Sequence, residues 1–257
     1  MQKYYYKTKD IIIINNDILK TDNIPNNYID LFITSPPYNV NKNYNNSNDN
    51  LPYEDYLKFS YNWLKKCYDM AKPDGRLCLN IPLDTGKGEQ KSLGADITYI
   101  AKKVGWKYKT TIIWNEGHIS NPMAKGSYMN ASCPNIITPI ELIVIMYKEQ
   151  WKKNKKGISD ITKEEFDEWT KGIWTFSGES KKKIGHPAPF PLELPKRCIK
   201  LFSYIDDVIC DPFLGSGTTI ISSKSLNRKS IGIEISKEYC DLSIKRINEK
   251  NQRTNKL

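Results

Sequence analysis

Apolar positions recur along the chain with two different spacings. Short runs rich in β-branched and other apolar residues are typical of buried strands, and they occur at residues 10–15, 29–33, 76–81, 109–114 and 141–147. Between Pro52 and Ala71 the apolar residues instead follow a helical spacing, and the turn at residues 72–75 ends that helix. Strands that alternate with helices predict an α/β fold with a doubly wound, mainly parallel sheet.

Residues 148–183 interrupt this alternation. The segment combines clustered charges with four large aromatic residues, Trp151, Trp169, Trp174 and Phe176. It is either a solvated surface insert or a lobe that faces nucleic acid. The alternation then resumes to about residue 248, and a frayed polar tail is expected from residue 249 onward. The chain is therefore divided into residues 1–147, 148–184 and 185–257.

A glycine-rich turn at residues 211–219 carries the first chemical signal. It follows an apolar strand at 207–210 and precedes a helix at 218–226, and a second strand at 230–233 ends at Glu234. Gly215 and Gly217 allow a tight turn and a close approach of the backbone to a ligand. Glu234 stands 19 residues after Gly215, an offset at which an acidic side chain reaches ribose hydroxyls. This unit is predicted to bind a nucleoside.

The residues absent from this turn narrow the choice of nucleoside. There is no Gly-Lys-Ser/Thr phosphate cradle, and the third glycine of the dinucleotide fingerprint is missing. Asp211 would repel phosphates and favour a cation such as an amino group. A nucleoside with a positively charged amino-acid tail, S-adenosylmethionine, fits these features. The alternative is an ordinary glycine-rich turn without a ligand.

The second signal is the segment at residues 34–39, directly after the strand at 29–33. Pro36 and Pro37 fix the backbone and leave rigid, outward-facing carbonyl acceptors. Together with the Ser35 hydroxyl, these acceptors suit an exocyclic amino group. Tyr38 offers a flat face for a base that has been flipped out of a duplex. A bare loop or a ligand for a WW domain is the alternative.

Composition bounds the class of protein. The 257 residues carry 39 Lys and Arg against 29 Asp and Glu, a net charge of +10, which admits nucleic acid as a partner. No apolar run approaches the ~20 residues of a membrane span, and the first residues lack the apolar core of a signal peptide, so a cytoplasmic protein is expected. The six cysteines are scattered, which predicts reduced thiols and no metal site.

The order of the two segments, TSPPYN before DPFLGSGTT, resembles the β-class DNA amino-methyltransferases of restriction–modification systems. The resemblance extends from Asp17 to Ile247 and includes the segment at residues 186–191. It implies a circularly permuted, seven-stranded methyltransferase fold in which residues 148–184 form the target-recognition region. It also implies double-stranded DNA as substrate, a cognate restriction endonuclease in the same system, and a monomer or homodimer.

The resemblance assigns roles to individual residues. The catalytic residues it implies are Ser35, Pro36, Pro37 and Tyr38. The residues it implies for S-adenosylmethionine are Asp17, Phe190, Asp211, Phe213, Gly215, Gly217, Thr218 and Glu234. The lysines expected to contact DNA are Lys42, Lys125, Lys152 and Lys153. His118 is expected to be solvated or structural, with a catalytic role as the alternative, and the role of His186, inside the segment at 186–191, is left open.

The Ser35-Pro-Pro-Tyr form favours transfer to the N4 amino group of cytosine, because members of the family with Ser at this place are mostly cytosine-N4 enzymes. Adenine-N6 is the alternative. Cytosine-C5 chemistry needs a nucleophilic cysteine, typically after a proline, and no Pro-Cys pair occurs. More remote alternatives are an RNA or protein-glutamine methyltransferase and an inactive nucleic-acid-binding module.

Overall fold

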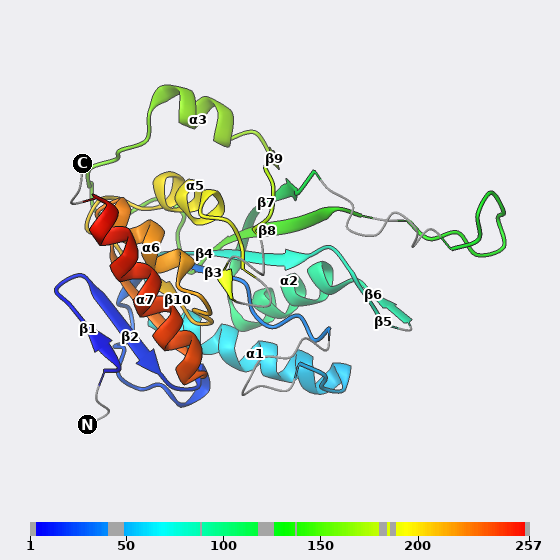
Figure 1. Cartoon of the computed structure of the whole chain (residues 1–257), viewed down its shortest axis with the longest axis horizontal. Coiled ribbons are helices and arrows are strands. Elements are labelled where there is room, and N and C mark those ends of the chain that lie inside the picture. Colours follow the sequence, from blue (N-terminus) through cyan, green and yellow to red (C-terminus); the bar gives the residue numbers. More distant parts are fainter. Residues whose placement is uncertain are drawn as a thin grey trace.

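The structure is a computed structural model that describes residues 4–40, 49–87, 89–117, 126–136, 138–179, 184–185 and 189–254. Its centre is a nine-stranded sheet in the order β1-β2-β11-β10-β3-β4-β8-β7-β9 (Figure 1). The strands are β1 (Tyr6–Lys7), β2 (Ile11–Asn15), β3 (Ile29–Thr34), β4 (Ala71–Pro82), β7 (Lys107–Asn115), β8 (Ile140–Tyr147), β9 (Ile173–Thr175), β10 (Val208–Asp211) and β11 (Lys229–Glu234). A separate hairpin consists of β5 (Thr85–Lys87) and β6 (Glu89–Lys91).

The expectation of a mainly parallel sheet is confirmed. Strands β2, β11, β10, β3 and β4 are mutually parallel, and β8 runs antiparallel to both β4 and β7. The expected number of seven strands is wrong, because two short strands extend the sheet at its edges. β1 forms an antiparallel hairpin with β2, and β9 pairs in parallel with the end of β7.

Helices cover both faces of the sheet. The period-2 alternation of β3 explains why, since Phe32 packs into one apolar cluster while Leu31 and Ile33 pack into another. One face carries α1 (Tyr53–Met70) and α2 (Leu93–Val104), beside the short 3-10 helix η1 (Ile18–Lys20). The other carries α3 (Lys163–Trp169), α5 (Glu193–Phe202), α6 (Thr218–Ser225) and α7 (Lys237–Thr254). This is a doubly wound, three-layer arrangement.

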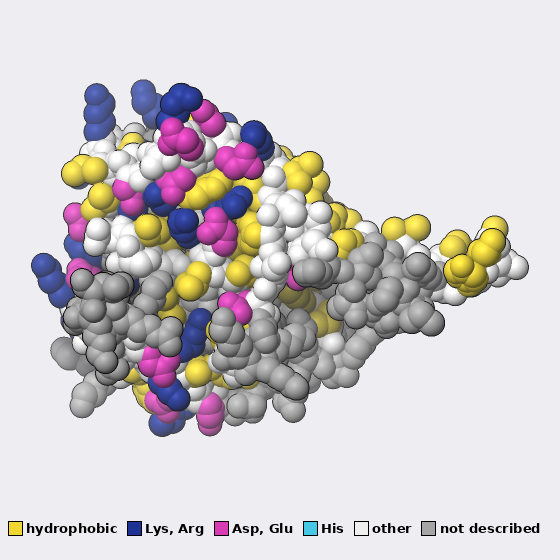
Figure 2. Space-filling model, turned by 45° about the horizontal axis from the view of Figure 1, so that its top comes forward, with side chains coloured by type: hydrophobic (Ala, Val, Ile, Leu, Met, Phe, Trp, Pro, Cys, Tyr) yellow, Lys and Arg dark blue, Asp and Glu magenta, His cyan; other side chains and the backbone are white. Residues whose placement is uncertain are grey.

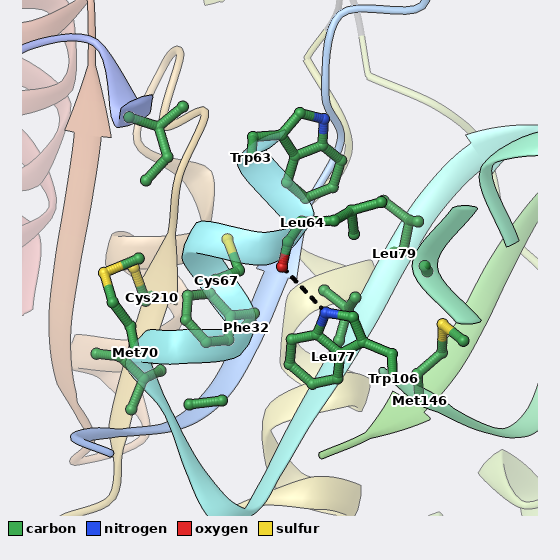
Figure 3. Packing of buried hydrophobic residues seen from close by; sticks show 14 of the residues in the cluster. Phe32, Trp63, Leu64, Cys67, Met70, Leu77, Leu79, Trp106, Met146 and Cys210 are labelled. Atoms are coloured by element: carbon green, nitrogen blue, oxygen red, sulfur yellow. Dashed lines mark hydrogen bonds between the residues drawn. The ribbon is translucent and has the colours of Figure 1, made fainter. Parts of the chain in front are cut away.

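The core beneath α1 is built from large aromatic and aliphatic side chains (Figure 3). Trp63 and Leu64 are fully buried on α1, and the Trp106 indole donates a hydrogen bond of 3.2 Å to the Leu64 carbonyl. The ring of Trp106 also meets Phe32 edge to face, with centroids 6.3 Å apart. These contacts fix α1 against the strand that leads into residues 34–39.

Two local expectations differ from the structure. The sequence predicts a turn at residues 72–75 between helix and strand, but β4 already begins at Ala71, and its pairing with β3 is irregular between Ile29 and Leu31. The frayed tail expected from residue 249 is helical as far as Thr254, where α7 ends, and residues 255–257 lie outside the described residues.

The segment at residues 148–179 packs against the sheet instead of standing apart. Trp169 and Trp174 are buried, and the Arg197 guanidinium of α5 lies 5.4 Å and 5.3 Å from the centroids of their rings. Its strand β9 continues the main sheet. Within the described ranges no helix is long and apolar enough to cross a membrane.

Candidate functional site

The two segments singled out in the sequence lie side by side. Residues 35–38 follow β3 and residues 212–217 follow β10, and these strands are adjacent and parallel. Both segments therefore emerge at the carboxyl edge of the sheet, where α/β folds bind their ligands. The Thr34 hydroxyl donates a 2.9 Å hydrogen bond to Asp211 Oδ1, which joins the two strand ends directly.

The glycine-rich loop takes its shape from two residues with left-handed backbone. Gly215 has φ +52° and Gly217 has φ +79°. A Cβ atom on Gly217 would lie 2.7 Å from the Ser243 Cβ on α7, closer than two carbon atoms can approach. Arg246, also on α7, donates to the Ser216 carbonyl and to Thr218 Oγ1. The loop is thus held from behind by α7.

Asp211 is buried at the base of this loop, with 1% of its surface exposed. Its carboxylate accepts hydrogen bonds from Thr34, from Thr219 at 2.7 Å and from the Phe213 N–H at 3.1 Å. Burial raises the pKa of Asp211 to about 6, and the two threonine hydroxyls and the Phe213 N–H partly oppose that rise. In this position Asp211 links the loop to β3, and a direct contact with the cofactor's amino group stays a prediction.

Glu234 ends β11 beside the loop and is 9% exposed. Its two oxygens accept 2.8 Å hydrogen bonds from the N–H groups of Gly215 and Ser236. Burial raises the pKa of Glu234, and these N–H groups oppose the rise. Each carboxylate oxygen accepts up to two hydrogen bonds, so both can also accept from a ribose hydroxyl. Asp17 lies nearby, because the Asn16 N–H donates to the Glu234 carbonyl.

The remaining residues expected at the cofactor lie around the same loop. Phe213 packs edge to face against Trp63 of α1, with centroids 5.3 Å apart. Thr218 is the first residue of α6, and Phe190 packs partly buried against the cluster beneath α5. The structure therefore assembles at one edge an acidic side chain, a loop with left-handed glycines and the first turn of a helix. Such a set fits the ribose and the amino-acid tail of S-adenosylmethionine.

Ser35 and Tyr38 form a compact polar cluster with two residues that the sequence reasoning missed. The Ser35 and Tyr38 hydroxyl oxygens are 2.5 Å apart. Tyr38 donates to Glu141 Oε2 at 3.2 Å, and the Asn80 amide donates to Tyr38 at 3.1 Å and to Glu141 at 2.5 Å. Asn80 comes from β4 and Glu141 from β8. Each is a polar residue with apolar neighbours on both sides in its strand, and this is the signal that could have revealed them.

The loop that follows is held in place by further hydrogen bonds. The Pro37 carbonyl accepts a 2.9 Å bond from Tyr56 of α1. Asn39 adopts φ +58°, and its N–H donates to Asp49 at 2.8 Å. Tyr38 itself is 7% exposed, so the expectation that its ring stacks on a base stays a prediction.

Of the lysines expected to contact DNA, the structure describes Lys152 and Lys153, and these two do not lie at this edge. Lys153 is 8% exposed in its side chain and forms ion pairs of 3.5 Å with Asp30 and 3.4 Å with Asp207. Asp30 lies at the start of β3 and Asp207 just before β10, at the edge opposite Ser35. Lys152 is exposed next to it. Both lysines lie at the edge opposite Ser35, and whether they contact DNA stays a prediction. Lys42, Lys125, His118 and His186 lie outside the described residues.

Comparison with known proteins places this site in a family. A family model described as DNA methylase, of the N6/N4 methyltransferase type, matches residues 29–245. The chain is 58% identical over 182 residues to Type II methyltransferase M.MjaVI of Methanocaldococcus jannaschii, which covers 71% of this chain and 93% of that protein. It is 31% identical over 240 residues to Type II methyltransferase M.HpaI of Haemophilus parainfluenzae, covering 92% and 73%.

The fold has solved counterparts as well. A protein from Thermus thermophilus described as a DNA modification methylase, solved in complex with S-adenosyl-L-methionine, aligns with a TM-score of 0.68 and 28% identity over 88% of this chain and 90% of that one. The family match extends from β3 to α7, so it contains both segments that meet at the carboxyl edge. The chain therefore belongs to the S-adenosylmethionine-dependent N6/N4 DNA amino-methyltransferases of restriction–modification systems.

Proposed function

We propose that this protein transfers a methyl group from S-adenosylmethionine to the exocyclic N4 of cytosine in double-stranded DNA, and so protects its site from a cognate restriction endonuclease. The observation that supports this most strongly is the Thr34–Asp211 hydrogen bond, which puts the Ser35-Pro-Pro-Tyr segment directly beside the glycine-rich loop. An amino group bound at Ser35 is then next to a methyl donor bound at the loop.

The choice of cytosine rests on Ser35 and on the resemblance of this segment to cytosine-N4 enzymes. Adenine-N6 methylation would use the same fold and the same hydrogen-bond acceptors. It is therefore the alternative that the experiment must distinguish.

The chain's own residues supply positioning and electrostatic stabilisation. S-adenosylmethionine, when bound, supplies an electrophilic methyl group. Glu234 and the loop around Gly215 hold its ribose and amino-acid parts. Ser35 Oγ and the Pro36 carbonyl accept hydrogen bonds from the two amino hydrogens of the flipped base. As the amino nitrogen becomes positive in the transition state, these acceptors stabilise it, and fixing it near the methyl group lowers the entropic cost.

The surface proposed to meet DNA is the carboxyl edge of the sheet. The β7–β8 connection leaves from this edge, on the side toward which the arrow of β4 points (Figure 1). Its described part, residues 126–136, carries a tip closed by hydrogen bonds from Ser127 Oγ to the Asn130 carbonyl (2.6 Å) and from the Cys133 N–H to Ser127 Oγ (2.9 Å).

Large apolar side chains stand exposed on this tip. Tyr128 is 78% exposed and Met129 is 90% exposed, and Figure 2 shows apolar side chains at the end of the arm. An ordered tip that presents apolar side chains on the side of the catalytic segment suits contact with a DNA groove. We therefore assign target contact to this arm.

Nucleoside mass spectrometry tests the function. Plasmid DNA is incubated with the protein and S-adenosylmethionine, digested, and analysed for methylated nucleosides. N4-methylcytosine is expected from the wild-type protein and is strongly reduced with Ser35→Ala. Ser159→Ala, an exposed serine distant from the site, is the matched control and should behave as wild type. N6-methyladenine would overturn the choice of base, and no product on DNA of varied sequence would overturn the proposed function.

A further inference from the structure

The hydrogen bonds of the polar cluster at the catalytic segment have a defined donor-to-acceptor direction. Glu141 contributes a carboxylate, which as an ion only accepts hydrogen bonds. Asn80 donates one amide hydrogen to Glu141 and the other to the Tyr38 oxygen. The opposite orientation of this amide would place its oxygen 2.5 Å from a carboxylate oxygen, where the two would repel each other. The charge of Glu141 therefore sets the orientation of Asn80.

The same charge sets the direction of the Tyr38 hydroxyl. Its single hydrogen can be donated to Glu141 Oε2 at 3.2 Å, to the Asn80 carbonyl at 3.3 Å or to Ser35 Oγ at 2.5 Å, because either hydroxyl of the Ser35–Tyr38 pair can be the donor. Of these acceptors only the Glu141 carboxylate carries a charge, and a charged acceptor forms the stronger hydrogen bond, which favours the arrangement in which Tyr38 donates to Glu141. The 2.5 Å contact between Tyr38 and Ser35 must then use the Ser35 hydrogen, with the Tyr38 oxygen as acceptor.

We propose that Glu141 is a positioning residue that acts through Tyr38 to make Ser35 Oγ a pure acceptor toward the target amino group. Because the Ser35 hydrogen is directed at Tyr38, only lone pairs of Ser35 Oγ face the substrate. An amino group offers hydrogens, so this polarity matches the base before reaction and stabilises the positive nitrogen that develops during methyl transfer. The inference rests on the proposed function, in which Ser35 contacts the amino group.

Removing the charge of Glu141 should remove the preference of the Ser35 hydrogen for pointing at Tyr38. In Glu141→Gln the side-chain amide can donate to the Tyr38 oxygen, and Tyr38 is then free to direct its hydrogen at Ser35. Loss of a directly contacting group costs about 100- to 1000-fold in kcat. For an effect transmitted through two hydrogen bonds we expect kcat to fall about tenfold, with KM and the Kd for S-adenosylmethionine changed less than about twofold.

Glu149→Gln is the matched control. Glu149 follows the same strand β8 at its other end, is exposed, and lies at the opposite edge of the sheet. The substitution removes the same charge from the chain without touching the cluster, and its kcat should equal that of the wild type. A kcat for Glu141→Gln within about twofold of wild type would overturn the proposal.

A double-mutant cycle separates action through Tyr38 from a general structural effect. Tyr38→Phe keeps the aromatic ring and removes the hydroxyl through which Glu141 is connected to Ser35. Rates are measured in single turnovers with a tritiated methyl donor, so that slow variants remain quantifiable. The proposal predicts similar losses in both single variants and almost no further loss in the double variant. Independent, multiplicative losses, or a Tyr38→Phe loss far larger than that of Glu141→Gln, would overturn it.

The proposed function and the role proposed for Glu141 can be disproved separately. Wild-type protein that makes no methylated amino base overturns the proposed function, and this inference with it. Wild-type protein that makes the product, with Glu141→Gln as active as Glu149→Gln, overturns the inference alone.

Discussion

The Thr34 hydroxyl and the Asp211 carboxylate meet at 2.9 Å although 177 positions separate them in the chain. Thr34 immediately precedes the catalytic segment and Asp211 immediately precedes the glycine-rich loop, and both side chains are fully buried. One hydrogen bond thus fixes the distance between the place of the target amino group and the place of the methyl donor. Because Asp211 accepts this hydrogen bond, the relative position of the two binding places depends on the protonation state of Asp211.

The stability of the protein should depend on pH through Asp211. Its pKa is raised to about 6 in the folded protein and is about 3.9 in an unfolded chain. Between these values the folded state binds more protons, so the contribution of Asp211 to the free energy of unfolding falls as pH rises from about 4 to about 6 and is constant above about 7.

Asp211→Asn removes this titration. Urea unfolding of both proteins at about pH 4.5, 5.5 and 7.5 should show the wild type losing stability relative to the variant as pH rises across that window. A difference that is independent of pH, or that grows in favour of the wild type with rising pH, would contradict the burial argument.

Gly217→Ala should damage the cofactor loop. The new methyl group would lie 2.7 Å from Ser243 Cβ, and the left-handed backbone at φ +79° costs an additional ~1–2 kcal/mol for a residue with a side chain. We expect lower stability in urea and a Kd for S-adenosylmethionine raised at least about tenfold by calorimetry. Gly172→Ala, where no atom lies within 4 Å of the new Cβ, should leave both unchanged.

The tip of the β7–β8 arm should contribute to DNA binding and not to cofactor binding. In the double variant Tyr128→Ser, Met129→Ser we expect weaker binding of a duplex containing the target site, measured by fluorescence anisotropy, with an unchanged Kd for S-adenosylmethionine. Ile158→Ser removes another exposed apolar side chain, 69% exposed, away from this arm. Equal DNA affinity in the tip variant and in this control would refute the assignment.

Lys153 should matter for folding and not for DNA. Lys153→Met removes a cation from the ion pairs with Asp30 and Asp207, and leaving these carboxylates with fewer partners should cost about 1–3 kcal/mol of stability. The salt dependence of DNA binding should not change, because a lysine that contacts no phosphate releases no counterions. A shallower salt slope in the variant would restore Lys153 as a DNA contact.

The features that could be predicted from the sequence are those that depend on local pattern. The strand–turn–helix–strand unit around Gly215 and the strand before Ser35 are confirmed, because apolar runs and glycine-rich turns act over a few neighbouring residues. The meeting of the two segments is known only from the sheet order, which makes β3 and β10 adjacent and parallel, so that their ends lie at one edge.

The features that could not be predicted depend on partners distant in sequence. Glu141 is one carboxylate among 29 acidic residues, and only the pairing of β8 with β4 brings it to Tyr38. The sequence places Lys153 in a basic cluster, which is typical of an exposed charge. The packing of that segment instead buries its side chain, where it forms ion pairs with two aspartates. The two short edge strands carry too few residues for a period-2 pattern to be visible.

The position of β10 and β11 between β2 and β3 has a consequence for synthesis of the protein. β2 and β3 emerge early from the ribosome, yet the two strands that fill the gap between them begin only at Val208 and Lys229. The centre of the sheet therefore closes only after β10 and β11 have been translated. A chain that ends before Val208 holds Ser35 without the glycine-rich loop, and so contains only one of the two segments that form the site.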